Sequence, residues 1–154
     1  MEIKNQRIAQ IVCLQQNLSA IRKIAGWTAE QLGEKIGVTK QTISNLENRK
    51  TTMTLTQYIA IRSVIDFEIQ MNKENKVLPQ VVEILLDRDE KYTDEEREKI
   101  RESVKTVAAT AAGGITGTSL LAVSVGLLGG MLGAKIGGIA TTSVWLSKIL
   151  RENK

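Results

Sequence analysis

The feature that most constrains the fold of the first half of this sequence is a helical spacing of apolar residues that single glycines interrupt. Apolar residues recur every three or four positions up to Gly37, and a second period begins near Thr39. Residues at this spacing lie on one side of a helix, so the pattern predicts two short helices joined by a tight turn, an arrangement typical of DNA-binding domains. The residues predicted to face inward are Leu32, Ile36, Val38, Ile43 and Leu46.

Longer helices are predicted on both sides of this pair. The apolar spacing over residues 3–25 predicts a long first helix that ends at Gly26. Thr28 stands where its hydroxyl can cap the following helix, and Gln31 completes a capping box three residues later. After a polar connector, a fourth helix is predicted over residues 55–65 and closes a small core.

The remainder of the chain is also predicted to be helical. A polar stretch sets a boundary at residues 73–76, and the single proline, Pro79, suits the first turn of a short buried helix. Thr93 and Glu96 form a second capping box, where a further helix begins. Aromatic residues make up only 3% of the chain, which favours helices packed through aliphatic side chains over a sheet. We therefore expect an all-α protein.

The run from Thr106 to Ala134 contains no charged residue. Its glycines create several G-x-x-x-G spacings, which let two helix backbones approach closely. The pattern predicts a glycine-rich helical hairpin. As a membrane hairpin it would have one arm over 106–128, a turn at Gly129–Gly130 and a second arm over 131–150. The glycines involved are Gly113, Gly117, Gly126, Gly129, Gly130, Gly133 and Gly137.

Three interpretations of this hairpin are open. A membrane hairpin has the required length, and the basic residues Lys148, Arg151 and Lys154 would place both ends on the cytoplasmic side, although Lys135 would lie awkwardly in the bilayer. In a soluble glycine zipper, small residues would instead let helices from several chains pack together. The third interpretation is a pair of ordinary core helices.

The side-chain chemistry argues against catalysis. Histidine is absent and Cys13 is the only cysteine, so the usual zinc ligands and the usual partners of a catalytic nucleophile are missing. We expect no enzyme activity, no metal or other cofactor and no small-molecule ligand. The N-terminus lacks the apolar stretch of a secretory signal peptide, so we expect a cytoplasmic protein, attached to the inner face of the membrane if the hairpin inserts.

Charge divides the chain into three parts. Residues 1–76 carry eleven Lys and Arg against seven Asp and Glu, a net charge of +4; residues 77–105 carry six against nine, −3; residues 106–154 carry four against one, +3. We expect a DNA-binding domain in the first part, a charged helical connector in the second and the glycine-rich hairpin in the third, serving oligomerisation or membrane attachment.

A set of residues distributed over 17–66 recurs in one known family of DNA-binding domains. Its members are Leu18, Ile21, Arg22, Gly26, Trp27, Thr28, Leu32, Ile36, Gly37, Val38, Ile43, Ser44, Leu46 and Glu47. On these residues the segment resembles the XRE/Cro/C1-type regulators, which implies a lambda-repressor-like helix-turn-helix bundle. The resemblance also implies an ion pair between Arg22 and Glu47 that holds the first helix against the third.

Two residues depart from that family. Ala29 stands where many relatives have a glutamine that contacts phosphate, which removes one contact. Arg49 replaces the glycine commonly found after the recognition helix, so the conformation of that turn is left open.

The polar side of the third helix offers side chains suited to a major groove. Gln41 can satisfy both polar groups on an adenine edge, Lys40 can donate to guanine, and Arg49 and Lys50 can contact phosphates. The predicted DNA-contacting residues are Thr28, Thr39, Lys40, Gln41, Ser44, Asn45, Arg49 and Lys50. The alternative is that this side is a solvated face of a helical bundle that binds protein.

These observations predict a sequence-specific regulator of transcription, a repressor that binds double-stranded DNA. At least a homodimer is expected, because one small domain contacts only a few base pairs. The fourth helix, residues 67–71 or the C-terminal hairpin could supply the dimer contact. The alternative is a self-assembling or membrane-active effector of the toxin–antitoxin or phage-defence type, with an autoregulatory helix-turn-helix.

Overall fold

Helices form all the regular secondary structure in residues 2–87, 91–129 and 142–151, the ranges that the computed structural model describes. The predicted all-α class is confirmed. The elements are α1 (Glu2–Ile24), α2 (Ala29–Ile36), α3 (Lys40–Glu47), α4 (Leu55–Met71), α5 (Val77–Val82), the π-helical turn η1 (Glu83–Asp87), α6 (Asp94–Ala112), α7 (Gly117–Leu128) and α8 (Thr142–Leu150).

The predicted start signals agree with the helix boundaries. Thr28 caps α2 and Thr93 caps α6, each in a complete capping box. Pro79 lies in the first turn of α5, where its missing N–H has no helical acceptor to lose. α1 ends before Gly26, which adopts the left-handed φ of 84° that glycine tolerates best.

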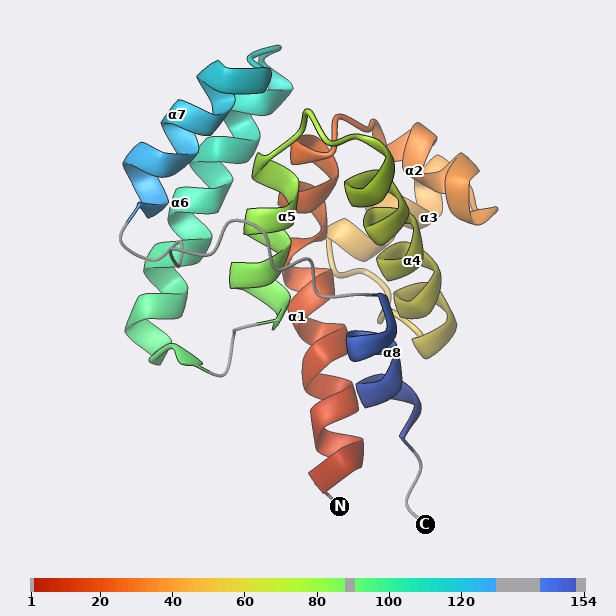
Figure 1. The fold of residues 1–154 in the computed structure, drawn as a ribbon. Coiled ribbons are helices and arrows are strands. Elements are labelled where there is room, and N and C mark those ends of the chain that lie inside the picture. The colour runs from red at the N-terminus through yellow and green to blue at the C-terminus, as the bar shows by residue number, and fades with distance from the viewer. Residues whose placement is uncertain (1, 88–90, 130–141, 152–154) are drawn as a thin grey trace.

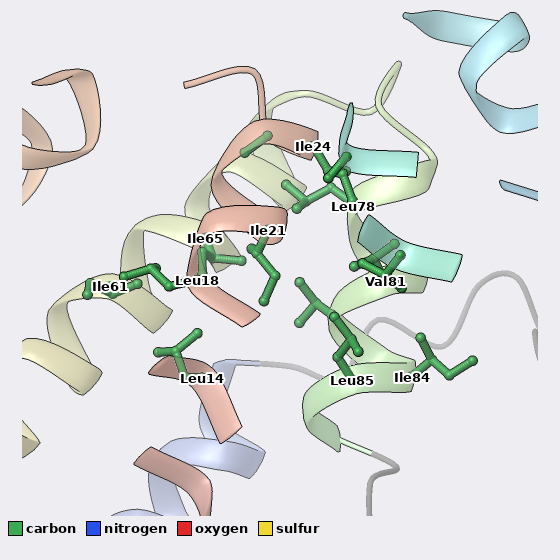
Figure 2. Packing of buried hydrophobic residues seen from close by; sticks show 14 of the residues in the cluster. Leu14, Leu18, Ile21, Ile24, Ile61, Ile65, Leu78, Val81, Ile84 and Leu85 are labelled. Carbon is green, nitrogen blue, oxygen red and sulfur yellow. The ribbon is translucent and has the colours of Figure 1, made fainter. Parts of the chain in front are cut away.

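Helix α1 runs through the centre of the molecule and packs on two sides. Figure 2 shows its Leu14, Leu18 and Ile21 between α4, which contributes Ile61 and Ile65, and the α5–η1 segment. These aliphatic side chains are at most 1% exposed. The three-to-four-residue spacing of apolar residues therefore produces one continuous aliphatic core around α1.

Helices α5, α6 and α7 lie on the side of α1 away from α2, α3 and α4 (Figure 1). Val104 and Val107 of α6 and Leu120 of α7 are buried and join the same core as the first four helices. The charged connector predicted over 77–105 thus contains helices that pack along α1. The division of the chain into three domains stays a prediction.

The prediction of a single helix for the first arm of the uncharged run is wrong. Instead of one helix over 106–128, α6 continues to Ala112, the chain turns, and α7 begins at Gly117. Gly114 and Gly117 have left-handed φ values of 94° and 64°, so both belong to a turn, whereas the sequence pattern predicted a helix contact for Gly117. Figure 1 shows α6 and α7 side by side as a hairpin. Gly130 and most of the predicted second arm lie outside the described residues.

Over the ranges described above, no helix combines the length and hydropathy needed to cross a lipid bilayer.

Helix α8 docks on α4 through a buried polar cluster. The Trp145 indole N–H donates to the Asp66 carboxylate, and the Tyr58 ring meets the indole edge-on with ring centroids 5.8 Å apart. The Arg62 guanidinium lies 5.0 Å from the same indole ring and donates to Asp87 Oδ1 at 3.1 Å. Removal from water disfavours charge, so burial raises the pKa of Tyr58 to about 12 and also raises the pKa of Asp66.

Asp66→Asn should reduce the dependence of stability on pH. A raised pKa means that the folded state holds the Asp66 proton more tightly than the unfolded chain does, so the free energy of unfolding falls as pH rises above the ordinary carboxyl pKa of 3.8. Asparagine keeps an acceptor for Trp145 but does not titrate.

Urea unfolding between about pH 4 and pH 7 should show the variant gaining stability relative to the wild-type protein as pH rises. A relative loss over that range would mean that the attraction between Asp66 and Arg62 outweighs the effect of burial.

Candidate nucleic-acid interface

Two glycines fix the turn between α2 and α3. Gly37 ends α2 with a left-handed φ of 77°. Gly33 lies where a Cβ would come within 2.6 Å of the Val38 carbonyl oxygen, and its own carbonyl accepts the Val38 N–H at 2.9 Å. Sequence reasoning used Gly37 but missed Gly33. Its position inside a helix was the available signal, because glycine is unfavourable there unless another backbone comes close.

Helix α3 has one buried and one solvent-facing side. Ile43 and Leu46 are fully buried, and Val38 packs against the same core from the turn. The predicted inward direction of these three residues is confirmed. The polar residues of α3 consequently lie on its outer side.

Four of the predicted DNA-contacting residues share that outer side. Lys40 and Gln41 are exposed in the first turn of α3, and Ser44 and Asn45 are partly exposed one turn later. Gln41 Nε2 donates to Asn45 Oδ1 at 2.9 Å. Linked amides of this kind supply the donors and acceptors that a purine edge requires.

Thr28 and Thr39 act as helix caps. Thr28 Oγ1 accepts the Gln31 N–H and Thr39 Oγ1 accepts the Thr42 N–H, both at 3.1 Å. Both threonines are exposed at helix N-termini, where backbone amides and the helix dipole favour an anion such as phosphate. The capping bonds are observed, whereas the contact of both threonines with DNA remains a prediction.

Arg49 and Lys50 form the C-terminal end of the recognition helix. The Lys50 N–H donates to Asn45 O at 2.9 Å and the Arg49 N–H to Leu46 O at 3.2 Å, the two bonds of a Schellman motif. Arg49 occupies its left-handed position at φ 57°. Arginine thus adopts a conformation that glycine adopts more easily, at a cost of about 1 kcal/mol in backbone strain.

Arg22 and Glu47 form a two-pronged ion pair between α1 and the end of α3. Arg22 Nε and Nη2 donate to the two Glu47 carboxylate oxygens at 2.7 and 3.3 Å, and Nη1 donates to Trp27 O at 2.8 Å. The side chains are only 13% and 9% exposed, so water screens the pair weakly. The pair is placed as the family resemblance implied.

Gln15 provides a second link from α1, which sequence reasoning missed. Its Nε2 donates to Leu46 O at 3.0 Å and to Thr51 O at 2.7 Å, and its Oε1 accepts the Met53 N–H at 3.0 Å. One buried amide thus bonds a backbone group in the last turn of α3 and two in the connection to α4. The signal was its position three residues before Leu18, on the inner side of α1, where a polar group needs partners.

A pair of short helices with a buried aliphatic side and an exposed polar and basic side defines a helix-turn-helix DNA-binding module. A family model described as helix-turn-helix matches residues 18–70. The chain is similar to Antitoxin HipB of Escherichia coli strain K12, with 30% identity over 78 residues, which are 51% of this chain and 89% of the relative. For Antitoxin HipB of Escherichia coli O6:H1 (strain CFT073), identity is 28% over 78 residues, 51% and 83% of the two chains. No solved structure matches at a significant level.

The chain belongs to the XRE/Cro/C1-type helix-turn-helix family, and it is a DNA-binding regulator.

Gln15→Leu should destabilise the connection between α3 and α4. The substitution removes the side-chain partner of the Thr51 carbonyl and of the buried Met53 N–H, whereas Leu46 O keeps the Arg49 N–H. Each group left without a partner costs roughly 1–3 kcal/mol. We expect the free energy of unfolding to fall by about 3 kcal/mol in urea denaturation, with faster hydrogen exchange at the Met53 amide. Gln16→Leu, the same change at the neighbouring exposed position, should leave both quantities nearly unchanged. Equal effects at the two positions would contradict the role of Gln15.

Arg22 and Glu47 should be strongly coupled in a double-mutant cycle. Arg22→Met strands a mostly buried carboxylate and Glu47→Leu strands a mostly buried guanidinium, so each should cost about 3 kcal/mol. The double variant retains neither charge, and its loss of unfolding free energy should be smaller than the sum by about 1–3 kcal/mol. Additive losses in urea unfolding would show that the pair contributes no coupling.

Proposed function

We propose that this protein is a sequence-specific repressor that binds double-stranded DNA as a two-fold dimer and inserts α3 into the major groove. The observation that supports the proposal is that α3 has one buried aliphatic side and one exposed polar side. Ile43 and Leu46 are fully buried, whereas Lys40 and Gln41 on the opposite side are exposed. A major groove about 12 Å wide admits one such helix, and occupation of a site near a promoter would turn that promoter off.

The side chains divide into those that would read bases and those that would hold phosphates. Gln41 would bond an adenine edge and Lys40 a guanine edge, while Ser44 and Asn45 would reach bases or phosphates one turn along. The exposed Arg49 and Lys50 would contact phosphates beyond the helix. The amide-bearing N-termini capped by Thr28 and Thr39 would add phosphate contacts.

Helix α4 carries the surface that we assign to the dimer contact. Phe67 and Met71 are one helical turn apart, and 62% and 69% of their surfaces are exposed. Pairing these side chains across a two-fold axis would remove apolar surface from water on both chains at once. Residues 106–150 are the alternative source of this contact.

A second candidate function, a role in a toxin–antitoxin system, is favoured by the names of the two curated relatives, which are both antitoxins. In that role the helix-turn-helix would regulate the expression of its own genes. Residues 106–150 would then meet a partner protein or act as a self-assembling or membrane-active segment.

We assign residues 106–129 to packing on the rest of the chain in preference to a bilayer. Support comes from Val107, Leu120 and Leu128, which are at most 3% exposed in the common core. A DNA-bound regulator of this kind would act in the cytoplasm. It would work by binding, without catalysis, metal or cofactor.

DNA selection with the full-length protein tests the proposal. The selected sequences should contain two related half-sites about 10 base pairs apart. Gln41→Ala should remove the preference at one position in each half-site, a discrimination of roughly 1–3 kcal/mol. Lys105→Gln, on the exposed side of α6, is the control and should keep the full preference. Recovery of no common sequence, or an unchanged preference with Gln41→Ala, would contradict direct reading by α3.

Arg49→Gly should separate stability from DNA binding. Glycine relieves the left-handed strain, so the free energy of unfolding should rise by up to about 1 kcal/mol. Loss of one phosphate contact should lower the slope of log binding constant against log salt concentration by about 1. Urea unfolding and DNA titrations at several salt concentrations give the two quantities. An unchanged slope would exclude a phosphate contact by Arg49.

A further inference from the structure

A cavity of about 190 Å³ lies between α1, η1 and α6. It opens on a different side of α1 from Gln15 and Arg22, which hold the recognition helix. The helix-turn-helix function does not use it. Its walls come from segments far apart in sequence, so the sequence alone, from which we expected no small-molecule ligand, does not reveal it.

The floor of the cavity is apolar and built into the core. Ile84, Leu85 and Ile100 line it and are at most 4% exposed. Cys13 lines it as well, and its Sγ donates to the Leu85 carbonyl at 3.1 Å. Leu85 lies in the π-helical turn η1, a rare conformation that occurs frequently at functional sites.

The rim of the cavity is basic. Arg97 and Arg101 lie one turn apart on α6, and they are the charged residues among the described ones that line the cavity. Their ion pairs with Asp94 and Glu98 are 3.4 and 3.7 Å long, and those carboxylates are 101% and 62% exposed. An exposed pair contributes little, so an incoming anion can compete with Glu98 for Arg101.

We propose that this cavity binds a small organic anion with a short apolar chain, the anionic group at the two arginines and the chain against the aliphatic floor. Since a water molecule takes up about 30 Å³, the volume holds roughly six atoms of that size, which suits a chain of about five carbons with its carboxylate at the rim. Guanidinium groups match a carboxylate in shape and charge. Gln16 and Asn17 of α1 add neutral amide groups to the wall.

The ligand would also affect DNA binding, a step that rests on the proposed function. The helix that lines the cavity through Cys13 holds α3 through Gln15 and Arg22. If the anion binds more tightly when α1 lies in one of two positions, its binding would therefore shift α1, and α3 with it. By linkage, DNA would change the affinity for the anion by the same factor.

Cys13 is a reporter for this site, because it is the only cysteine and lines the cavity. Hexanoate should slow the alkylation of Cys13 by iodoacetamide in the full-length protein, with saturation. Hexanol and hexylammonium lack the anion and acetate lacks the chain, so at equal ionic strength each should slow it much less. Hexanoate should also raise the melting temperature of the protein. This second measurement tests binding if the alkylation of Cys13 is too slow to measure. Equal effects of hexanol, or no effect of hexanoate on either quantity, would overturn the proposal.

Arg101→Gln should weaken hexanoate binding about tenfold through loss of a charge-assisted contact. Arg97→Gln gives a second test if that variant fails to fold. Lys105→Gln, one turn farther along α6 and outside the cavity lining, should bind hexanoate as the wild-type protein does. Undiminished binding in the arginine variants would overturn recognition of the anion.

A DNA titration with and without hexanoate tests the coupling. Affinity should change at least about fivefold in the wild-type protein and not in Arg101→Gln. Alkylation and melting do not involve DNA, so a protein that binds hexanoate but no DNA would contradict the proposed function and leave the anion site standing. Hexanoate binding with an unchanged DNA affinity would contradict the coupling through α1.

Discussion

The structure depends on one helix, α1, holding the recognition helix by polar contacts at two points. Gln15 bonds one backbone group in the last turn of α3 and two beyond it, and Arg22 binds Glu47 at the end of the helix. Aliphatic packing of Ile43 and Leu46 holds α3 against the core but sets its direction only loosely, because hydrophobic burial is non-directional. The directional bonds from α1 supply what packing lacks, so the outer side of α3 is presented at a defined angle.

The same helix also forms the centre of the second half of the molecule. Leu14, Leu18 and Ile21 contact the α5–η1 side as well as α4 in one core. A change in how α6 lies against α1 is therefore transmitted to a helix that also supports α3. This shared support gives the cavity beside Cys13 a physical route to the DNA-binding surface.

The interface combines contacts that stabilise the fold with one that opposes it. Thr28 and Thr39 cap their helices, so their hydroxyls contribute to folding. Arg49, in contrast, occupies a left-handed position in which glycine would be more stable. A cation held in a strained position at the end of α3 is consistent with a role in phosphate contact, because such strain concentrates at functional sites.

Local sequence alone determined the helices of residues 17–66, their caps and the inward direction of Val38, Ile43 and Leu46, because these features depend on neighbours within one or two helical turns. Tertiary structure decided the partners of Gln15, the turn at Gly113–Gly114 inside the uncharged run, and the docking of Trp145 beside Asp66. Gln15 and Trp145 find their partners far away in the chain, and the turn brings α7 back against α6. Spacing shows which side of a helix is buried, but only the folded chain shows what lies against that side.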